Sequence, residues 1–112
     1  MTMKDDVALV YQITSINRAW KRAREQWGED SAIALMLRER KSSLQARLVR
    51  DSPDAVYLRS DTDNTDGEPL YSVRLKSQVQ LPNGVTRSDA EHMPVRLAQE
   101  LFSPAELAGI VK

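Results

Sequence analysis

The acidic residues of one segment are the first in this sequence whose types and spacing suggest chemistry. Asp61 and Asp63 stand two apart, as the first and third ligands of a calcium-binding loop do. The other positions do not fit, because Gly67 arrives one place late and Ser72 stands where a bidentate glutamate is needed. Aspartate and asparagine also favour turns through hydrogen bonds to their own backbone. The segment is therefore typical of an exposed polar loop, and we expect neither a metal nor a cofactor.

The chain has a single histidine, His92, and no cysteine. The lack of cysteine excludes disulfides, thiolate catalysis and zinc sites built on sulfur. Asp89 and Glu91 are near His92 in sequence, but adjacent residues of a helix do not converge on one point. Ser88 could act as a nucleophile, yet nothing in the sequence fixes its geometry. We interpret His92 as a surface residue of a loop and expect that the chain is not an enzyme.

Basic side chains form a third group, which could contact the phosphates of a nucleic acid. Arg40, Arg47 and Arg50 fall along one flank of the second expected helix at 100° per residue. Arg74 and Lys76 lie on the solvent side of a later expected strand and could extend this surface. The signal is modest, because 16 Lys and Arg balance 16 Asp and Glu and the tyrosines are not interleaved with basic residues. Nucleic-acid binding is therefore an alternative hypothesis.

The charges are divided unequally between the two halves of the sequence. Residues 1–51 carry ten Lys and Arg against seven Asp and Glu, a net +3, and residues 52–112 carry six against nine, a net −3. Such a division favours contact between oppositely charged surfaces, within the screening length of about 8 to 10 Å. The longest early apolar run, residues 7–11, is far shorter than the roughly 20 residues that span a bilayer. We expect a cytoplasmic protein that does not enter a membrane.

The elements that must position these residues begin with an amphipathic helix. Six apolar residues recur at alternating spacings of four and three: Leu9, Ile13, Ile16, Trp20, Ala23 and Trp27. Gly28 follows the last of them and suits the left-handed conformation that closes helices. A second periodic segment begins at Asp30 or Ser31. The pattern predicts two antiparallel helices packed on each other.

The start of the first helix leaves an alternative open. Residues 7–11 are apolar all around the helix axis and include residues that favour strands. A strand from Val7 to Thr14, followed by a shorter helix capped at Ser15, is the competing prediction. We prefer the helix because the spacing of three and four continues unbroken through Ile13 and Ile16.

The second helix carries its own apolar stripe, which should face the first helix: Ile33, Leu37, Leu44 and Leu48. Lys41 falls at the edge of this stripe, where its aliphatic stem can lie along the surface. Pro53 ends the helix, because proline cannot continue the helical hydrogen bonds.

Beyond Pro53 the apolar period changes from that of a helix to two, which indicates strands. Residues 55–60 predict a short strand, and a longer strand follows with five core-facing residues: Tyr71, Val73, Leu75, Val79 and Leu81. Asn83-Gly84 tolerates the positive φ angles of a tight hairpin turn. Residues 85–87 should therefore return as a short third strand.

The C-terminal part returns to helical signals. Ser88 and Glu91 have the spacing of a capping box, so we predict a helix from Ser88 that is interrupted at Met93-Pro94 and continues beyond it. A further short helix has a complete start signal of cap residue, first-turn proline and glutamate: Ser103, Pro104 and Glu106.

Together these patterns predict one α+β domain over residues 1–112. Residues 1–51 form an N-terminal antiparallel helical hairpin. Residues 52–112 form an antiparallel β-meander of about three strands and two short C-terminal helices. The length fits one domain with a single core.

The first functional hypothesis is a small non-enzymatic regulatory or protein-interaction module, with a homodimer as one form of it. The apolar residues exceed what one small core can hide. Val7, Tyr11 and Trp27 are the candidate interface residues, since aromatic side chains dominate interface energetics. The long strand also offers an edge for pairing with another chain. An enzyme with an unrecognised carboxylate site is the least favoured alternative.

Overall fold

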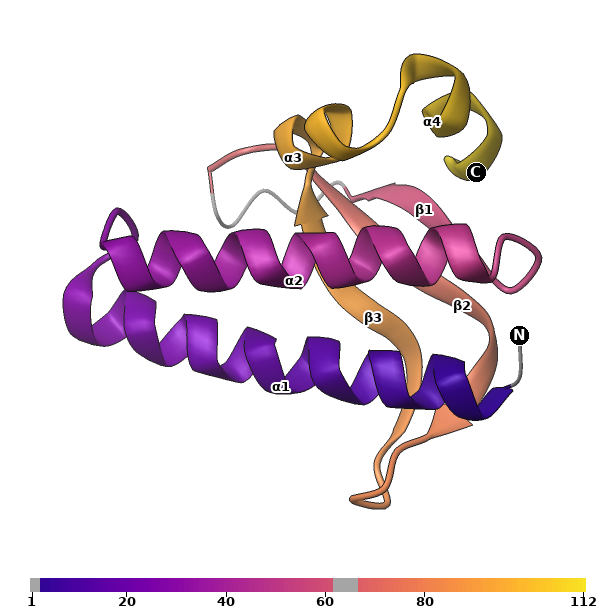
Figure 1. The fold of residues 1–112 in the computed structure, drawn as a ribbon, viewed down its shortest axis with the longest axis horizontal. Coiled ribbons are helices and arrows are strands. Elements are labelled where there is room, and N and C mark those ends of the chain that lie inside the picture. Colours follow the sequence, from indigo (N-terminus) through magenta and orange to yellow (C-terminus); the bar gives the residue numbers. More distant parts are fainter. Residues whose placement is uncertain (1–2, 62–66) are drawn as a thin grey trace.

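The chain folds into a pair of long antiparallel helices that lies across a three-stranded antiparallel sheet (Figure 1). The computed structural model describes residues 3–61 and 67–112. Two short helices at the C-terminal end lie at one end of the sheet. The elements are, in order, α1 (Met3–Trp27), α2 (Ala32–Asp51), β1 (Val56–Asp61), β2 (Leu70–Gln80), β3 (Thr86–Pro94), α3 (Val95–Leu101) and α4 (Pro104–Ile110). The predicted α+β fold is confirmed.

The apolar start of α1 is helical, so the alternative strand from Val7 to Thr14 is wrong. Val10 and Ile13 are fully buried, and Val7 and Tyr11 are half-buried against the same core. The segment is apolar around much of its axis because α1 contacts both α2 and β3. A helix that packs against other elements on more than one side can bury apolar residues around much of its axis instead of along one narrow apolar stripe.

Both ends of α2 follow the sequence signals. Gly28 adopts the left-handed conformation with φ of 95°, and the Ser31 hydroxyl accepts a hydrogen bond from the Ala34 backbone N–H at 3.2 Å. At the other end, the Ser52 hydroxyl donates to the Asp6 carboxylate at 2.6 Å. This last bond ties the start of α1 to the end of α2, so the open end of the hairpin is closed by a polar contact.

Helix α2 is buried on more of its surface than the stripe predicts. Leu44 and Leu48 are buried as expected, whereas Ile33 is 41% exposed. Lys41 does not lie at a solvent edge, because it is only 3% exposed, and Gln45 is completely buried. The reason is that α2 contacts α1, α3 and the sheet. An apolar stripe predicts the residues that one neighbouring helix buries. It does not predict all the buried residues of a helix that packs against several elements.

The sheet has the order β1-β2-β3, with β2 in the middle. Leu58 stands opposite Val73, and both side chains are buried beneath the helices. The turn after β2 is the predicted one, since Gly84 has φ of 87° and the Asn83 side-chain oxygen accepts from the Val85 backbone N–H at 3.1 Å. The meander is therefore confirmed in its first two strands and its turn.

Strand β3 is longer than predicted and replaces the helix expected from Ser88. His92 accordingly lies in a strand and not in a loop. The register between β2 and β3 shifts twice, and Glu91 has a positive φ of 66°. This bulge leaves the buried residues Ala90 and Met93 three apart, which is a helical spacing. The helix was predicted from the capping-box spacing of Ser88 and Glu91, and this spacing was misleading because both residues lie in the strand.

The C-terminal helix begins as predicted. The Ser103 hydroxyl and the Glu106 side chain form a complete capping box with each other's backbone N–H groups, at 3.1 and 3.0 Å. Beyond the helix, Val111 forms a bridge to Leu58, and the Lys112 backbone N–H donates to the Leu58 carbonyl at 2.8 Å. The C-terminal segment therefore covers part of the outer edge of β1.

The buried apolar side chains of the described residues form two separate clusters. The main core lies between the helices and the sheet, and it includes Leu48, Leu58 and Val73. A smaller cluster of Trp20, Ala23 and Ala34, with Leu37 packed against it, lies nearer the closed end of the hairpin. Figure 1 shows that this end extends past the sheet. Within residues 3–61 and 67–112, no helix is long and apolar enough to cross a membrane.

We predict that the contact between Arg50 of α2 and Glu106 of α4 stabilises the fold at neutral pH and that this stabilisation is lost in acid. A hydrogen bond from Arg50 at 3.1 Å, aided by the Ser103 backbone N–H, lowers the pKa of Glu106 below its ordinary value of 4.5. A depressed pKa stabilises the fold above the ordinary value, and that stabilisation is lost as the pH falls through the folded value. Glu106→Gln keeps the capping box but loses the ion pair. It should lower the urea midpoint at pH 7 and approach wild type toward pH 2.

The exposed glutamate of α3 provides the control for this prediction. Glu100→Gln should leave the pH dependence of the urea midpoint unchanged. An equal difference between wild type and Glu106→Gln at pH 7 and at pH 2 would contradict the assignment.

Candidate functional site

Exposed apolar side chains gather at the closed end of the helical hairpin. We call residues 27–36 the hairpin tip. Among the described residues, five large hydrophobic side chains are exposed, and four of these belong to the tip: Trp27 at 61%, Ile33 at 41%, Leu35 at 45% and Met36 at 60%. Val85, in the turn after β2, is the fifth. The tip is therefore the part of the described surface where exposed large apolar groups are concentrated.

The geometry of α2 distributes these groups around the tip. Ile33 and Met36 are three residues apart and share a face, while Leu35 lies about 160° around the axis from Ile33. Trp27 ends α1 and adds a large ring from the neighbouring helix. The tip extends past the sheet (Figure 1). Ile33 and Leu35 lie on nearly opposite sides of α2, so the tip has exposed apolar groups in more than one direction. Such a projection fits into a recess better than it fits onto a flat surface.

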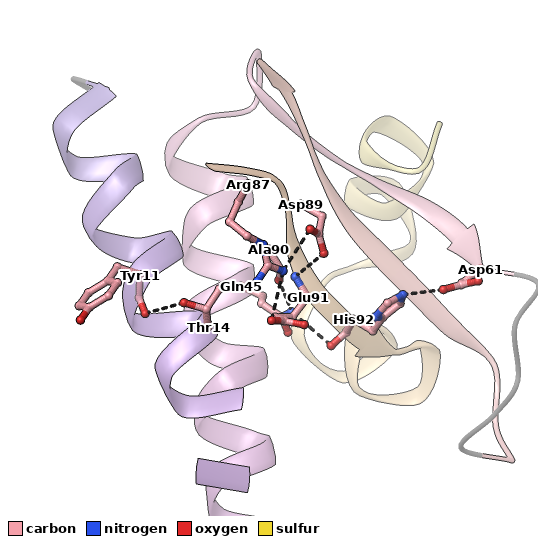
Figure 2. Close-up of polar contacts among 9 residues, drawn as sticks. All are labelled: Tyr11, Thr14, Gln45, Asp61, Arg87, Asp89, Ala90, Glu91 and His92. Carbon is pink, nitrogen blue, oxygen red and sulfur yellow. Dashed lines mark hydrogen bonds and ion pairs between the residues drawn. The ribbon is translucent and has the colours of Figure 1, made fainter. Parts of the chain in front are cut away.

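The three interface residues predicted from the sequence do not form one surface. Trp27 is exposed at the tip, whereas Val7 and Tyr11 are half-buried against the main core. Sixteen residues separate Tyr11 from Trp27, which is roughly 24 Å along a helix. Figure 2 shows the ring of Tyr11 on the side of α1 that is turned away from the sheet, and the Thr14 hydroxyl donates to the Tyr11 carbonyl. The structure brings only Trp27 together with other exposed apolar groups.

The expected strand edge is closed over much of its length. The long strand is β2, and it pairs with β1 and with β3 on its two sides. The Gln45 side chain also reaches the strand β3, where its amide nitrogen donates to the carbonyls of Ala90 at 2.8 Å and His92 at 3.2 Å (Figure 2). The prediction that the long strand offers an edge is therefore wrong where both neighbours pair with it.

The basic residues predicted for nucleic acid lie in two places. Arg40 and Arg47 are exposed on the outer face of α2, where Arg47 lies 3.5 Å from Asp51. Arg74 and Lys76 alternate along β2 with core residues, so they lie on the sheet face turned away from the helices. The two groups therefore do not form one continuous surface.

Arg50, the remaining member of the predicted basic ridge, is engaged within the fold. Its guanidinium donates to the Glu106 carboxylate and to the Leu101 carbonyl, and it lies 4.9 Å from the centre of the Phe102 ring. The hydrogen bond to Glu106 raises the pKa of Arg50, which keeps the charge on this side chain. Arg50 joins α2 to the C-terminal helices.

A pocket of about 280 Å³ lies beside the smaller apolar cluster. Four basic side chains line it, two from each helix of the hairpin: Lys21, Arg24, Arg38 and Lys41. Three of them converge on the ring of Trp20, with Arg24, Lys41 and Arg38 at 4.4, 4.5 and 5.1 Å from its centre. The buried Lys41 ammonium also donates to the Asn17 side-chain oxygen at 3.0 Å. The helical side of the pocket is therefore basic.

The sheet contributes the opposite side of the pocket, which holds two carboxylates and the histidine. His92 Nε2 lies 2.6 Å from an Asp61 carboxylate oxygen, and Glu91 lies 3.2 Å from the Arg87 guanidinium. The Glu91 backbone N–H donates to Asp89, which supports its left-handed conformation (Figure 2). Burial alone lowers the pKa of Arg87, but the charges of Glu91 and Asp89 outweigh this effect and raise it.

Reasoning from the sequence missed this pocket because its residues come from five elements. A partial signal was present, since Trp20 and Arg24 stand four apart on α1 and Arg38 and Lys41 stand three apart on α2. Among residues 3–61 and 67–112, no three metal-ligating side chains lie close enough together to hold a metal ion. The predicted loop around Asp63 lies largely outside the described residues.

Comparison with known proteins gives no match to a protein-family model, to a curated protein or to a solved structure. Function must therefore be inferred from the geometry of this chain. Two features of that geometry stand out: the apolar hairpin tip and the basic pocket beside it.

We predict that Gln45 contributes measurably to stability through strand β3. Gln45→Leu keeps a similar volume but leaves the buried carbonyl of Ala90 without its side-chain donor, which should cost about 1–2 kcal/mol of unfolding free energy. Gln26→Leu, at an exposed position of α1, should change it by less than about 0.5 kcal/mol. Urea denaturation measures both. Equal losses in the two variants would refute the role of the Gln45 contact.

Proposed function

We propose that this chain is a non-enzymatic protein-interaction module of the cytoplasm that binds a partner protein through the hairpin tip. The observation that carries the proposal is the concentration of four exposed large apolar side chains within residues 27–36. Scattered exposed hydrophobic residues are ordinary on a protein surface, but a cluster of them marks an interaction site. Tryptophan and methionine are also enriched in interfaces.

The construction of the hairpin supports this proposal. The tip is held by the small cluster around Trp20 rather than by the main core. Side chains such as Trp27 and Met36 therefore contribute little to folding, and their exposure costs free energy in water. Burying them against a partner recovers that free energy. Apolar residues that serve neither the core nor solubility are best explained by binding.

The charges around the tip define the chemistry of the partner. The face of α2 that carries Ile33 and Met36 continues into Arg40, one turn further along the helix. The helical half of the chain is also basic overall, with a net charge of +3. The tip itself carries two exposed carboxylates, Glu29 and Asp30. A partner that fits would therefore offer an apolar groove bordered by groups of both charges. A second copy of this chain offers both a basic and an acidic half, which is the homodimer form of the proposal.

Site-specific photo-crosslinking in the cells that make the protein tests this proposal. A photoreactive residue at position 36 should give a defined crosslinked species, while the same residue at the exposed control position 85 should not. Trp27→Ala should reduce the yield at position 36 strongly, because truncating a central aromatic residue costs about 2 kcal/mol, or roughly 30-fold in affinity. Its thermal unfolding should match that of wild type, since Trp27 is 61% exposed.

The outcomes separate the hypotheses. A species of twice the mass of the chain supports the homodimer form, and a species with another protein supports a distinct partner. No species above the position 85 control would refute the tip as an interaction site. Binding to mixed duplex DNA at low salt that is weakened by Arg40→Ala plus Arg47→Ala would favour the nucleic-acid alternative instead.

A further inference from the structure

The sheet carries a group of outward side chains that the interaction module does not use. In the pairing of β1 with β2, Leu58 and Val73 stand opposite each other in the core, so the neighbouring positions on both strands turn away from the helices. Arg59 and Lys76 are exposed there, and the other two members of the group are half-buried. We call these four side chains the basic sheet face: Tyr57, Arg59, Arg74 and Lys76.

The register of the sheet interleaves an aromatic ring with bases, although the sequence does not. Tyr57 stands directly opposite Arg74, which places their Cβ atoms about 5 Å apart. On its own strand Tyr57 is two residues from Arg59, whose guanidinium lies 6.0 Å from the centre of the ring. Lys76 is two residues beyond Arg74, and its backbone N–H donates to the Ala55 carbonyl at 2.9 Å, so it also lies beside β1.

The positive charges of this face are not neutralised by ion pairs. Among the residues that the structure describes, no carboxylate forms an ion pair with any of its three bases. Asp61, at the far end of β1, lies 2.6 Å from the histidine, and Asp89, which stands opposite Arg74, pairs with Arg87 at 3.1 Å. The exposed Asp54 precedes β1 and is a single charge. The field of the face is therefore positive.

A polyanion that also offers unpaired aromatic bases fits this arrangement. Arginine and lysine side chains contact phosphates, and the ring of Tyr57 provides a surface on which a base can stack. In a duplex the faces of the bases are covered by their neighbours, so the ring would have no role. An acidic peptide would satisfy the charges but would also leave the ring unused. The face therefore fits a single strand better than a duplex or an acidic protein.

We infer that the basic sheet face binds a single strand of nucleic acid. Its phosphates lie against Arg59, Arg74 and Lys76, and one of its bases stacks on Tyr57. This surface belongs to β1 and β2, whereas the hairpin tip consists of residues 27–36. The same molecule can therefore hold a protein at the tip and a nucleic acid on the sheet.

Fluorescence anisotropy of a labelled oligouridylate of about ten nucleotides tests this inference. Three phosphate contacts should give a slope of about −2 for log affinity against log salt concentration, since each contact to a single strand contributes about −0.7. Arg74→Gln plus Lys76→Gln should weaken binding roughly tenfold at low salt and reduce the slope to about −0.7. The matched control, Arg40→Gln plus Arg47→Gln, removes equal charge from the exposed face of α2 and should weaken binding less than about threefold.

The role of the ring is tested separately from the charges. Tyr57→Phe keeps the stacking surface and should bind as wild type does. Tyr57→Leu should weaken binding about fivefold or more and leave the salt slope unchanged, because it removes stacking and no charge. Since Tyr57 is half-buried, a variant at an exposed position keeps the test decisive if Tyr57→Leu proves unstable. Arg59→Gln should reduce the magnitude of the slope by about 0.7.

Three results would overturn the inference. An anisotropy that does not change at low salt would show that no single strand binds. Equal weakening by the two double variants would show that only the net charge of the protein acts. Equal binding of a duplex, or equally strong competition by poly-L-glutamate, would show that the face accepts any polyanion and that stacking on Tyr57 plays no part.

Discussion

The length of the helical hairpin relative to the sheet is the constraint on which the rest of this structure depends. The helices run across the strands (Figure 1), and neighbouring strands lie only about 4.8 Å apart. Three strands therefore give a narrow support, whereas the 25 residues of α1 extend roughly 37 Å. The hairpin must project past the sheet. The smaller cluster around Trp20, the exposed tip and the basic pocket beside β3 all result from this projection.

The central position of α2 is the second determinant. Because it contacts α1, α3 and the sheet, it buries polar side chains that an ordinary surface helix would expose. The Gln45 amide nitrogen donates to two carbonyls of β3, next to the bulge at Glu91, while its Oε1 is buried without a partner among the described residues. Lys41 donates to Asn17 and lies over Trp20. The same packing that supports the sheet thus places a buried ammonium group in the wall of the pocket.

The sequence predicts the parts of this fold that depend on neighbouring residues. The helix ends at Gly28 and Ser31, the turn at Asn83-Gly84 and the start of α4 at Ser103 use local hydrogen bonds, and all were found. The third strand was predicted too short, because Ser88 and Glu91 have the spacing of a capping box although both lie within β3. The burial of Lys41 could not be predicted, since it requires knowing that α2 has several partners.

The candidate sites follow the same rule as the fold. Features set by neighbouring residues could be predicted from the sequence, and features set by contacts between distant elements could not. Trp27 was identified from its residue type, but Ile33 was assigned to the core because its spacing matches the stripe that Leu44 and Leu48 do bury. The stripe predicts burial correctly only where α1 covers α2. Ile33 lies near the turn of the hairpin, where α1 no longer covers it. The pocket could not be found in this way, because Arg24, Lys41 and Glu91 are brought together only by the crossing of the hairpin over the edge of the sheet.

The tip and the pocket are both supported by the small apolar cluster around Trp20. Ala34 lies within the tip and packs on Trp20, and Trp20 lies in the wall of the pocket. A cluster of so few apolar residues opens more readily than the main core does. A partner that binds the tip and orders Ala34 therefore also orders Trp20 and the wall of the pocket. Because coupling free energies are reciprocal, any change that stiffens the packing around Trp20 must strengthen partner binding at the tip by as much as partner binding stiffens that packing.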